Sequence, residues 1–196
     1  MPLMIVFPDL LLAGAALLLL LIALGGHRVP RLVRVSRVSR EYGMMFAFIF
    51  IFQNGIARAC VVPTGSMEPT IQVQDRVWVN VLGTRLQGVH RGEVVVLHSP
   101  EETKVLCKRV VAVGGDKLEV RQGKLWINDQ AQNEKFLSEP IQGNYGPYRV
   151  PPRHIFVMGD NRNNSRDSRF FGSVLESDVM GRVSGIFWPF GRVSPL

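Results

Sequence analysis

The sequence predicts a mainly β fold behind two N-terminal transmembrane helices, and three observations support this prediction. An apolar stretch of 23 residues, Met4–Gly26, opens the chain, and a shorter apolar run, Met44–Ile56, follows it. From Ser66 onward, apolar residues come in short runs that alternate with polar residues and end at Gly, Pro or Asn. A period near two with turn residues between the runs is typical of β-strands. We therefore expect an all-β domain over residues 63–196.

The first apolar stretch is long enough to cross a membrane. Its only charge is Asp9, and a helix of about 20 residues spans the roughly 30 Å of hydrocarbon. A cleaved secretory signal is the alternative, but it needs positive charge before the apolar core, whereas the basic cluster of this chain follows it. We interpret residues 1–26 as a transmembrane helix, and the positive-inside tendency places the basic loop, residues 27–43, in the cytoplasm.

The second apolar run, Met44–Ile56, is short for a span and is closed by Arg58. An interfacial or core helix is the alternative at this length. We interpret residues 44–62 as a second transmembrane segment with its link, because the Arg58 side chain can extend to the far interface. On this topology the domain formed by residues 63–196 lies outside the cytoplasm.

Six apolar runs of the later domain have the composition of strands. "LEVRQGKLWI" is the clearest hairpin, with a turn at Gln122-Gly123. A second turn is expected at Gly114-Gly115, and the Pro- and Gly-rich segment Ser138–His154 is expected to be a long surface loop. The expected strands lie within "RVWVNVL", "GEVVVLHS", "KVLCKRVVAV", "KLEVRQGKLWIND", "HIFVMGD" and "DVMGRVSGIFW".

Charge and cysteine content argue against two classes of function. The net charge is +7, but five arginines between Arg28 and Arg40 carry most of the excess, which leaves little basic surface for nucleic acid. The two cysteines, Cys60 and Cys107, have neither metal-ligand spacing nor the pattern of a disulfide framework. A single bridge between them stays open at this point.

Ser66 is a candidate nucleophile, held between Pro63 and Pro69 in "VVPTGSMEPTIQ". A simple turn is the alternative, since Pro, Gly and Ser are turn residues. A serine nucleophile needs a base to take its proton. Of the histidines, His27 falls on the cytoplasmic side by the sidedness argument, and the other three, His90, His98 and His154, have no orienting carboxylate nearby in the sequence. A triad assembled in space stays open.

Lys108 is the other candidate base. It is one of only five lysines in the chain, and it lies inside the apolar run "VLCKRVVAV". Desolvation favours the neutral amine, which can accept a proton, whereas arginine cannot serve in this way. A lysine at a strand edge that points into solvent is an equal alternative from this segment alone.

A third segment, "GDNRNNSRDSRFFG", is rich in residues that form tight turns. Calcium binding is disfavoured because Arg162 occupies an expected ligand position. A hydroxyl of this segment, Ser165 or Ser168, can orient the lysine amine. Ion pairs that hold the loop are expected among Arg109, Asp160, Asp167 and Arg169.

The three segments, in this order behind two apolar N-terminal segments, resemble the type I signal peptidase family of membrane-anchored Ser/Lys endopeptidases. The resemblance lies in "PTGSMEPTI", "KRVVAVGGD" and "GDNRNNSRDSRFFG". It implies that Ser66 is the nucleophile, Lys108 the general base and Ser165 the hydroxyl that coordinates it. It also implies an oxyanion hole made by the Ser66 N–H and the Thr64 hydroxyl, and pockets for small substrate side chains lined by Met67, Val62, Cys60 and Cys107.

The same resemblance implies a fold, a location and partners. The fold would be a signal-peptidase-like antiparallel β catalytic domain, in the bacterial cytoplasmic (inner) membrane with the catalytic domain on the periplasmic or outer face. The partners would be preprotein signal peptides with small residues before the cleavage site, together with membrane lipid, and neither nucleic acid, a metal nor a cofactor. The oligomeric state stays open.

Three alternatives remain at the level of sequence. One is a specialised peptidase of the same fold that processes pilin-like subunits of conjugation systems. Another is a self-cleaving repressor, which the apolar stretch Met4–Gly26 disfavours because such proteins begin with a soluble DNA-binding region. The third is a membrane-tethered β domain that binds a partner without catalysis.

Overall fold

The computed structural model describes residues 4–5, 9–26, 33–101 and 104–196. By its internal contacts the chain divides into two compact units, Ile5–Ala59 and Cys60–Leu196, with the first four residues grouped with the second unit. His27 and the start of the predicted basic loop, residues 27–32, lie outside the described residues. The finer predicted division at residues 26, 43 and 62 stays a prediction.

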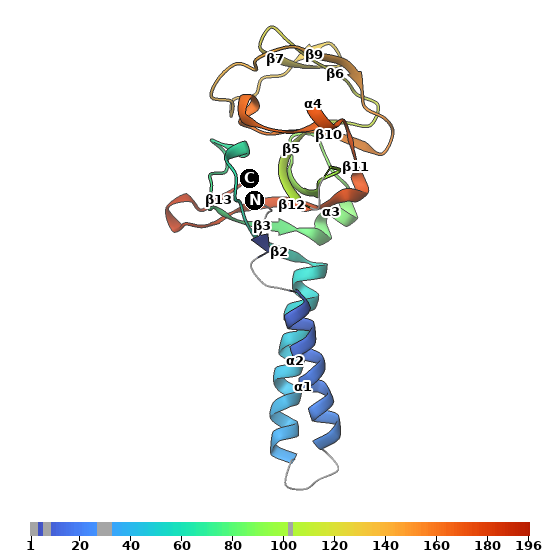
Figure 1. Cartoon of the computed structure of the whole chain (residues 1–196), viewed down its shortest axis with the longest axis vertical. Coiled ribbons are helices and arrows are strands. Elements are labelled where there is room, and N and C mark those ends of the chain that lie inside the picture. The colour runs from blue at the N-terminus through green and yellow to red at the C-terminus, as the bar shows by residue number, and fades with distance from the viewer. Residues whose placement is uncertain (1–3, 6–8, 27–32, 102–103) are drawn as a thin grey trace. The chain divides into compact units, whose positions relative to one another are not determined.

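The first unit contains two helices, α1 (Asp9–Gly26) and α2 (Val33–Gly55), which lie side by side (Figure 1). Gly43 permits their close approach, because a Cβ atom there would lie 3.1 Å from Leu20 Cγ. Helices therefore form over both apolar runs that the sequence singled out. In the described ranges, however, no helix combines the length and the apolar character that a membrane crossing requires, and the two predicted transmembrane helices are not confirmed.

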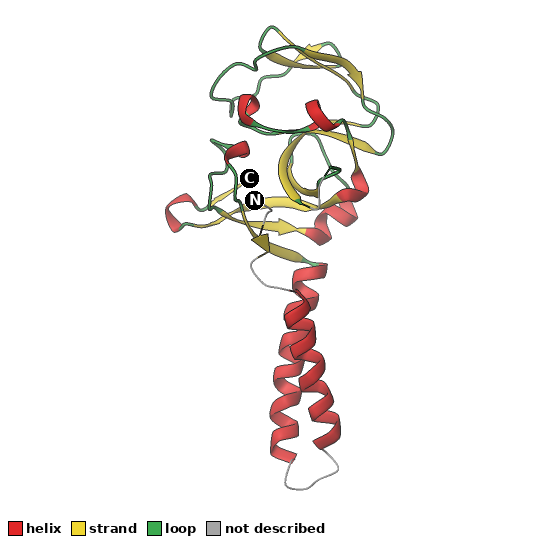
Figure 2. Ribbon diagram, viewed as in Figure 1, coloured by secondary structure: helices red, strands yellow, loops and turns green. Residues whose placement is uncertain are grey.

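A nine-stranded sheet has the order β1-β2-β3-β12-β4-β5-β10-β11 with β13 paired to β12. Figure 2 draws the strands in yellow. The strand pairs from β3 to β11 are antiparallel, which confirms the predicted mainly β fold. The strands are β1 (Met4–Ile5), β2 (Ala57–Val61), β3 (Arg76–Asn80), β4 (Val94–His98), β5 (Val105–Val113), β10 (His154–Met158), β11 (Val174–Leu175), β12 (Val179–Trp188) and β13 (Ser194–Pro195).

A second sheet has the order β8-β7-β6-β9. Its strands are β6 (Lys117–Arg121), β7 (Lys124–Ile127), β8 (Gln130–Ala131) and β9 (Tyr145–Arg149). The predicted hairpin is confirmed, since β6 and β7 pair antiparallel with Arg121 opposite Lys124. Gln122 and Gly123 both have positive φ, 52° and 74°, which is the backbone of a tight two-residue hairpin turn.

Two details of the predicted strands were wrong. The segment Ser138–His154 is not all loop, because β9 pairs with β6 and its tyrosines, Tyr145 and Tyr148, pack on Phe156 at ring distances of 5.4 and 5.5 Å. The strand expected through Leu82 ends at Asn80 instead. There the Asn80 side chain accepts a hydrogen bond from the Gly83 N–H at 2.7 Å and caps helix α3 (Val81–Gln87).

Short helical segments complete the second unit. Helix α4 (Ser168–Phe171) begins at Asp167, whose side chain accepts a hydrogen bond from the Arg169 N–H. Single 3₁₀ turns lie at Gly65–Met67, Arg162–Asn164, Glu176–Asp178 and Phe190–Arg192.

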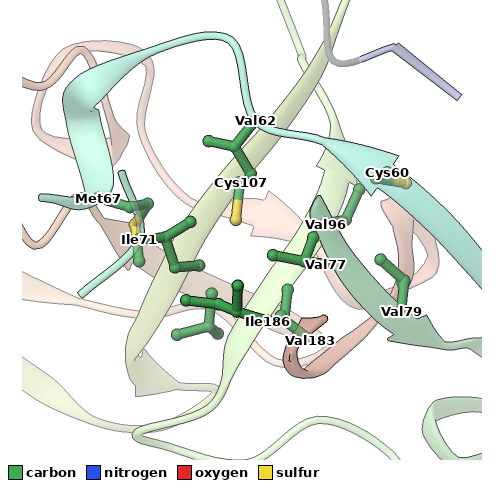
Figure 3. Close-up of a cluster of buried hydrophobic side chains, with 11 residues drawn as sticks. Cys60, Val62, Met67, Ile71, Val77, Val79, Val96, Cys107, Val183 and Ile186 are labelled. Carbon is green, nitrogen blue, oxygen red and sulfur yellow. The ribbon is translucent and has the colours of Figure 1, made fainter. Parts of the chain in front are cut away.

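The buried apolar side chains form three clusters, and the first lies beneath the segment that carries Ser66. Its members come from β2, β3, β4, β5 and β12 and from the segment after β2. Figure 3 shows Val62, Met67, Ile71 and Cys107 directed toward one another in this cluster. A second cluster joins β5 and β10 to the second sheet through residues such as Val111, Phe156 and Leu118. The strand that carries Lys108 is thus anchored on both sides of this residue, by Cys107 in the first cluster and by Val111 in the second.

Candidate active site

Ser66 lies in the 3₁₀ turn Gly65–Met67, directly after β2 and a short extended link. Met67 anchors this turn, because its side chain is fully buried in the first core cluster while Ser66 stays partly exposed. The Glu68 N–H donates to Gly65 O at 3.2 Å, and the Ile71 N–H donates to Met67 O at 3.0 Å. The turn therefore presents the Ser66 hydroxyl on a fixed backbone.

Lys108 lies on β5, which is paired with β4 on one side and with β10 on the other. Only 3% of the residue is exposed. Its Nζ atom lies 2.7 Å from Ser66 Oγ, within hydrogen-bond distance. Of the two alternatives for this lysine, the structure shows the buried one.

Burial lowers the pKa of the Lys108 amine below its ordinary value, because an ammonium group loses its hydration in this position. The negative charge of Asp167 acts in the opposite direction, and so, more weakly, does that of Asp160. Since desolvation is the larger effect, the site favours an uncharged amine, the form that can accept a proton from a serine hydroxyl.

Ser165 is the second hydroxyl beside the amine. Lys108 Nζ donates to Ser165 Oγ at 3.1 Å, whereas the other candidate hydroxyl, Ser168, accepts a hydrogen bond from the Val157 N–H at 3.0 Å. The amine thus lies between two serine hydroxyls, one from the Gly65–Met67 turn and one from the loop after β10.

The loop after β10 also holds the backbone of the nucleophile turn. The Asn161 N–H donates to Ser66 O at 3.0 Å, and the Asn161 side-chain amide donates to Gly65 O at 3.2 Å. Gly159 permits this close approach, because a Cβ atom there would collide with both the Ser165 side chain and Ser66 O. The loop therefore positions both Ser66 and Ser165.

Two ion pairs stabilise this loop: Arg109 binds Asp160, and Arg169 binds Asp167. The Arg109 guanidinium binds Asp160 at 2.8 and 2.6 Å, and Thr70 Oγ1 donates to the same carboxylate at 2.6 Å. Asp167 binds Arg169 Nε at 2.8 Å and accepts a hydrogen bond from the Gly159 N–H at 3.0 Å. Both carboxylates are buried, and a buried carboxylate requires such partners.

The residues expected at the oxyanion hole and in the substrate pocket lie around the same turn. Thr64 is exposed, with its Oγ1 atom 3.5 Å from Ser66 Oγ. The four expected pocket residues are buried in the first core cluster, with exposed fractions of 0–7%; they are Met67, Val62, Cys60 and Cys107. Cys60 and Cys107 are not joined by a disulfide. The roles of these residues toward substrate stay predictions.

Sequence reasoning did not single out Asn161 and Gly159, although both lie in the "GDN" that opens the third segment. It also missed a contact from the loop after β8. Arg162 binds Glu134 with two contacts of 2.6 Å, and the Phe136 ring lies 4.1 Å from the Arg109 guanidinium. Only the unusual density of Asn and Gly could have pointed to the loop, and nothing local in the sequence marks Glu134.

Among the described residues, no histidine forms a hydrogen bond with Ser66, whose Oγ atom contacts Thr64 and Lys108. His90 lies beside Glu93, with Nδ1 3.7 Å from its carboxylate, and His154 Nδ1 bonds to Pro152 O at 2.9 Å. Within the same residues, no group of three His, Cys, Asp or Glu side chains is arranged to hold a metal ion. The candidate base that lies within hydrogen-bond distance of the Ser66 hydroxyl is instead the amine of Lys108.

Comparison with known families agrees with the sequence resemblance. The family model described as "Signal peptidase, peptidase S26" matches residues 35–188. The chain belongs to this signal peptidase family. A serine endopeptidase that cleaves signal peptides from preproteins was the predicted activity, and membership of the family confirms it.

Several curated signal peptidases are similar to this chain over most of its length. A probable signal peptidase I-2 of Synechocystis sp. is 37% identical over 147 residues, which cover 72% of this chain and 67% of that protein. Signal peptidase I of Leptolyngbya laminosa is 35% identical over 165 residues, covering 80% and 81%. Signal peptidase IB of Staphylococcus aureus is 35% identical over 165 residues, covering 75% and 86%.

One solved structure, a signal peptidase I from Enterococcus faecalis, matches with a TM-score of 0.46 and 27% identity, over 49% of this chain and 97% of that one.

Proposed function

We propose that Ser66 is the nucleophile and Lys108 the general base of this signal peptidase. The observation that carries the proposal is the 2.7 Å contact between Ser66 Oγ and the buried Lys108 Nζ. In the neutral amine, the nitrogen lone pair accepts the Ser66 proton while Oγ forms a bond to the carbonyl carbon of the scissile peptide. The resulting ammonium then donates its proton to the leaving nitrogen as the peptide bond breaks, which releases the mature protein and leaves an acyl-enzyme.

The same amine completes the cycle. It takes a proton from a water molecule whose oxygen attacks the acyl carbonyl, and it returns a proton to Ser66 Oγ as the ester bond breaks. Ser165 serves as the positioning residue in this scheme, because its hydroxyl accepts a hydrogen bond from Lys108 Nζ and directs the amine toward Ser66.

Two donors would stabilise the oxyanion of the tetrahedral intermediates, the Ser66 N–H and the Thr64 hydroxyl. The support is that Thr64 Oγ1 lies 3.5 Å from Ser66 Oγ. The carbonyl oxygen of a substrate attacked by Oγ would lie beside both groups. Removing one such donor in other serine peptidases reduces kcat by about 10²–10³.

The signal peptide would bind as an added strand along β5. The ladder between β10 and β5 ends at Met158 opposite Arg109, whereas β4 continues to Val105 on the other side of β5. The edge of residues 105–108 that faces away from β4 is therefore available to an extended peptide, whose backbone makes the ladder bonds. We expect small residues before the scissile bond, as the family resemblance implies; the four expected pocket residues belong to the buried cluster beneath Ser66.

We also infer that the helical unit attaches the protein to the bacterial cytoplasmic membrane, with the β unit on the outer face. The support is the apolar composition of Met4–Gly26 and Met44–Ile56 and the arginines between them. Retention of the full chain in the membrane pellet after an alkaline carbonate wash is expected, and release into the supernatant would contradict the inference.

The test of the catalytic assignment is cleavage of a preprotein by purified full-length variants in detergent. Cleavage should be abolished in each of three variants, Ser66→Ala, Lys108→Ala and Lys108→Arg. The arginine variant is informative because arginine keeps a long cationic side chain but stays protonated and cannot act as a base. Matched controls are Ser177→Ala and Lys124→Arg, which change exposed residues of the same types elsewhere in the β unit. Unimpaired cleavage by a Ser66 or Lys108 variant would refute the assignment.

A further inference from the structure

A cavity of about 630 Å³ lies next to the nucleophile turn. One wall is formed by Glu68 and Pro69, which follow Ser66, and another by Asp160, Asn161 and Arg162 of the loop after β10; Glu139 closes a third side. The Glu68 carboxylate lies against the turn itself, since a Cβ atom on Gly65 would be 3.0 Å from its oxygens. The lining of the cavity therefore begins two residues after Ser66.

The position of the cavity relative to β5 indicates which part of a substrate it would meet. In the proposed binding mode, the residues before the scissile bond lie along residues 105–108 of β5, on the N-terminal side of Lys108. The cavity wall at Asp160 is instead bound to Arg109, on the C-terminal side of Lys108. An extended substrate passing Ser66 therefore enters the cavity with the residues that follow the scissile bond.

The charges in the cavity are unequal. Asp160 is neutralised by Arg109, and Arg162 by Glu134. Within the described residues, the carboxylates of Glu68 and Glu139 have no ion-pair or hydrogen-bond partner, so the cavity carries two uncompensated negative charges. An uncompensated carboxylate attracts a cationic group that comes near it and repels an anionic one.

We propose that this cavity is the subsite for the first residues of the mature protein, and that Glu68 and Glu139 make it favour cationic over anionic side chains. This inference rests on the proposed roles of Ser66 and Lys108 and adds a determinant of specificity on the far side of the scissile bond. Both carboxylates are at least partly exposed, so solvent screens them. Each should therefore change the ratio of kcat/KM for a cationic substrate to kcat/KM for an anionic one by about two- to fivefold, the range of solvent-screened ion pairs.

The experiment uses the full-length protein in detergent and three sets of peptide substrates with one common signal-peptide sequence. Each set places Lys, Gln or Glu at the first, second or third position after the cleavage site, and kcat/KM is measured for every peptide. The quantity compared is the Lys-to-Glu ratio within one enzyme preparation, which does not depend on the fraction of active enzyme. The enzymes are the native protein, Glu68→Gln, Glu139→Gln, the double variant and the control Glu176→Gln, which removes an equal charge outside the cavity.

The native protein and Glu176→Gln should prefer Lys to Glu by about four- to twentyfold at one position at least, and the preference should decrease in 0.5 M salt. The double variant should reduce the ratio to about one. A native ratio of one at all three positions, or an equal ratio in the double variant, would overturn the inference while leaving the catalytic assignment intact. Failure of Ser66→Ala to stop cleavage of the same peptides would instead refute the assignment itself.

Discussion

Lys108 Nζ and Ser66 Oγ lie 2.7 Å apart, although 42 residues separate them in the sequence. The same amine makes no ion pair with the two buried carboxylates near it. Asp160 is bound by Arg109 and Thr70, and Asp167 by Arg169 and the Gly159 N–H. The negative charge of Asp167 still raises the pKa of Lys108, and that of Asp160 does so more weakly, but desolvation lowers it by more. The loop is thus stabilised without charging the base.

The first prediction concerns the pH dependence of catalysis. Because burial lowers the pKa of Lys108 below 10.5, kcat/KM should rise with pH as the amine loses its proton and reach a plateau below 10.5. The change is measured as preprotein cleavage across mildly acidic to alkaline pH. In Ser165→Ala the plateau should be reduced, by about 10²-fold, because the amine is no longer directed toward Ser66. A flat profile for the native protein would exclude Lys108 as the base.

The second prediction concerns stability. The folded-state pKa of Lys108 lies below its unfolded value of 10.5, so between these two values the unfolded chain binds a proton that the folded protein does not. The contribution of this group to the free energy of unfolding is therefore present above 10.5 and is lost as pH falls through the folded pKa. Lys108→Met should raise Tm at neutral pH, and the gain should shrink toward pH 10.5. The exposed Lys124→Met should give no pH-dependent gain, and an equal pattern in both variants would contradict the explanation.

The third prediction concerns the contact between the Gly65–Met67 turn and the loop after β10. Gly159→Ala should reduce kcat by about 10² or more, because the added methyl group collides with the Ser165 side chain and Ser66 O and displaces both hydroxyls from the amine. Gly191→Ala is the matched control, since a Cβ atom there meets nothing within 4 Å. Comparable kcat values for the two variants, with unchanged circular dichroism, would show that the loop tolerates displacement.

The strand pattern and the chemistry of the site were predictable from different kinds of signal. Short apolar runs located β4 and β10, in which consecutive residues are buried, and alternating apolar residues located β3 and β6, in which every second residue is buried. β9 was missed because Gly146 and Pro147 are turn residues in a local reading, and only the packing of Tyr145 and Tyr148 on Phe156 makes the segment a strand. Local sequence does not contain that packing.

The site shows the same division. Lys108 drew attention as a charge inside an apolar run, a local signal, and Ser66 as a hydroxyl fixed by prolines. The binding of Asn161 to the Ser66 backbone and of Glu134 to Arg162 joins segments that are distant in the chain. Glu68 and Glu139 line one cavity only because the fold brings their segments together. Their spacing in the sequence gives no sign of this.

The last prediction concerns Cys107, which neighbours the base on β5. Burial raises the pKa of its thiol from 9.0 to about 12, and the thiolate is the species that reacts with alkylating reagents. The raised pKa lowers the fraction of thiolate at neutral pH, and burial restricts the access of the reagent. N-ethylmaleimide should therefore leave preprotein cleavage by the native protein unchanged, and mass spectrometry should find Cys107 unmodified until the protein is denatured. Cys107→Ser should retain the fold and remove the modification seen after denaturation. Rapid modification of Cys107 in the native protein, with loss of cleavage, would mean that this thiol is open to solvent and that the strand carrying Lys108 is less buried than the 7% exposure of Cys107 indicates.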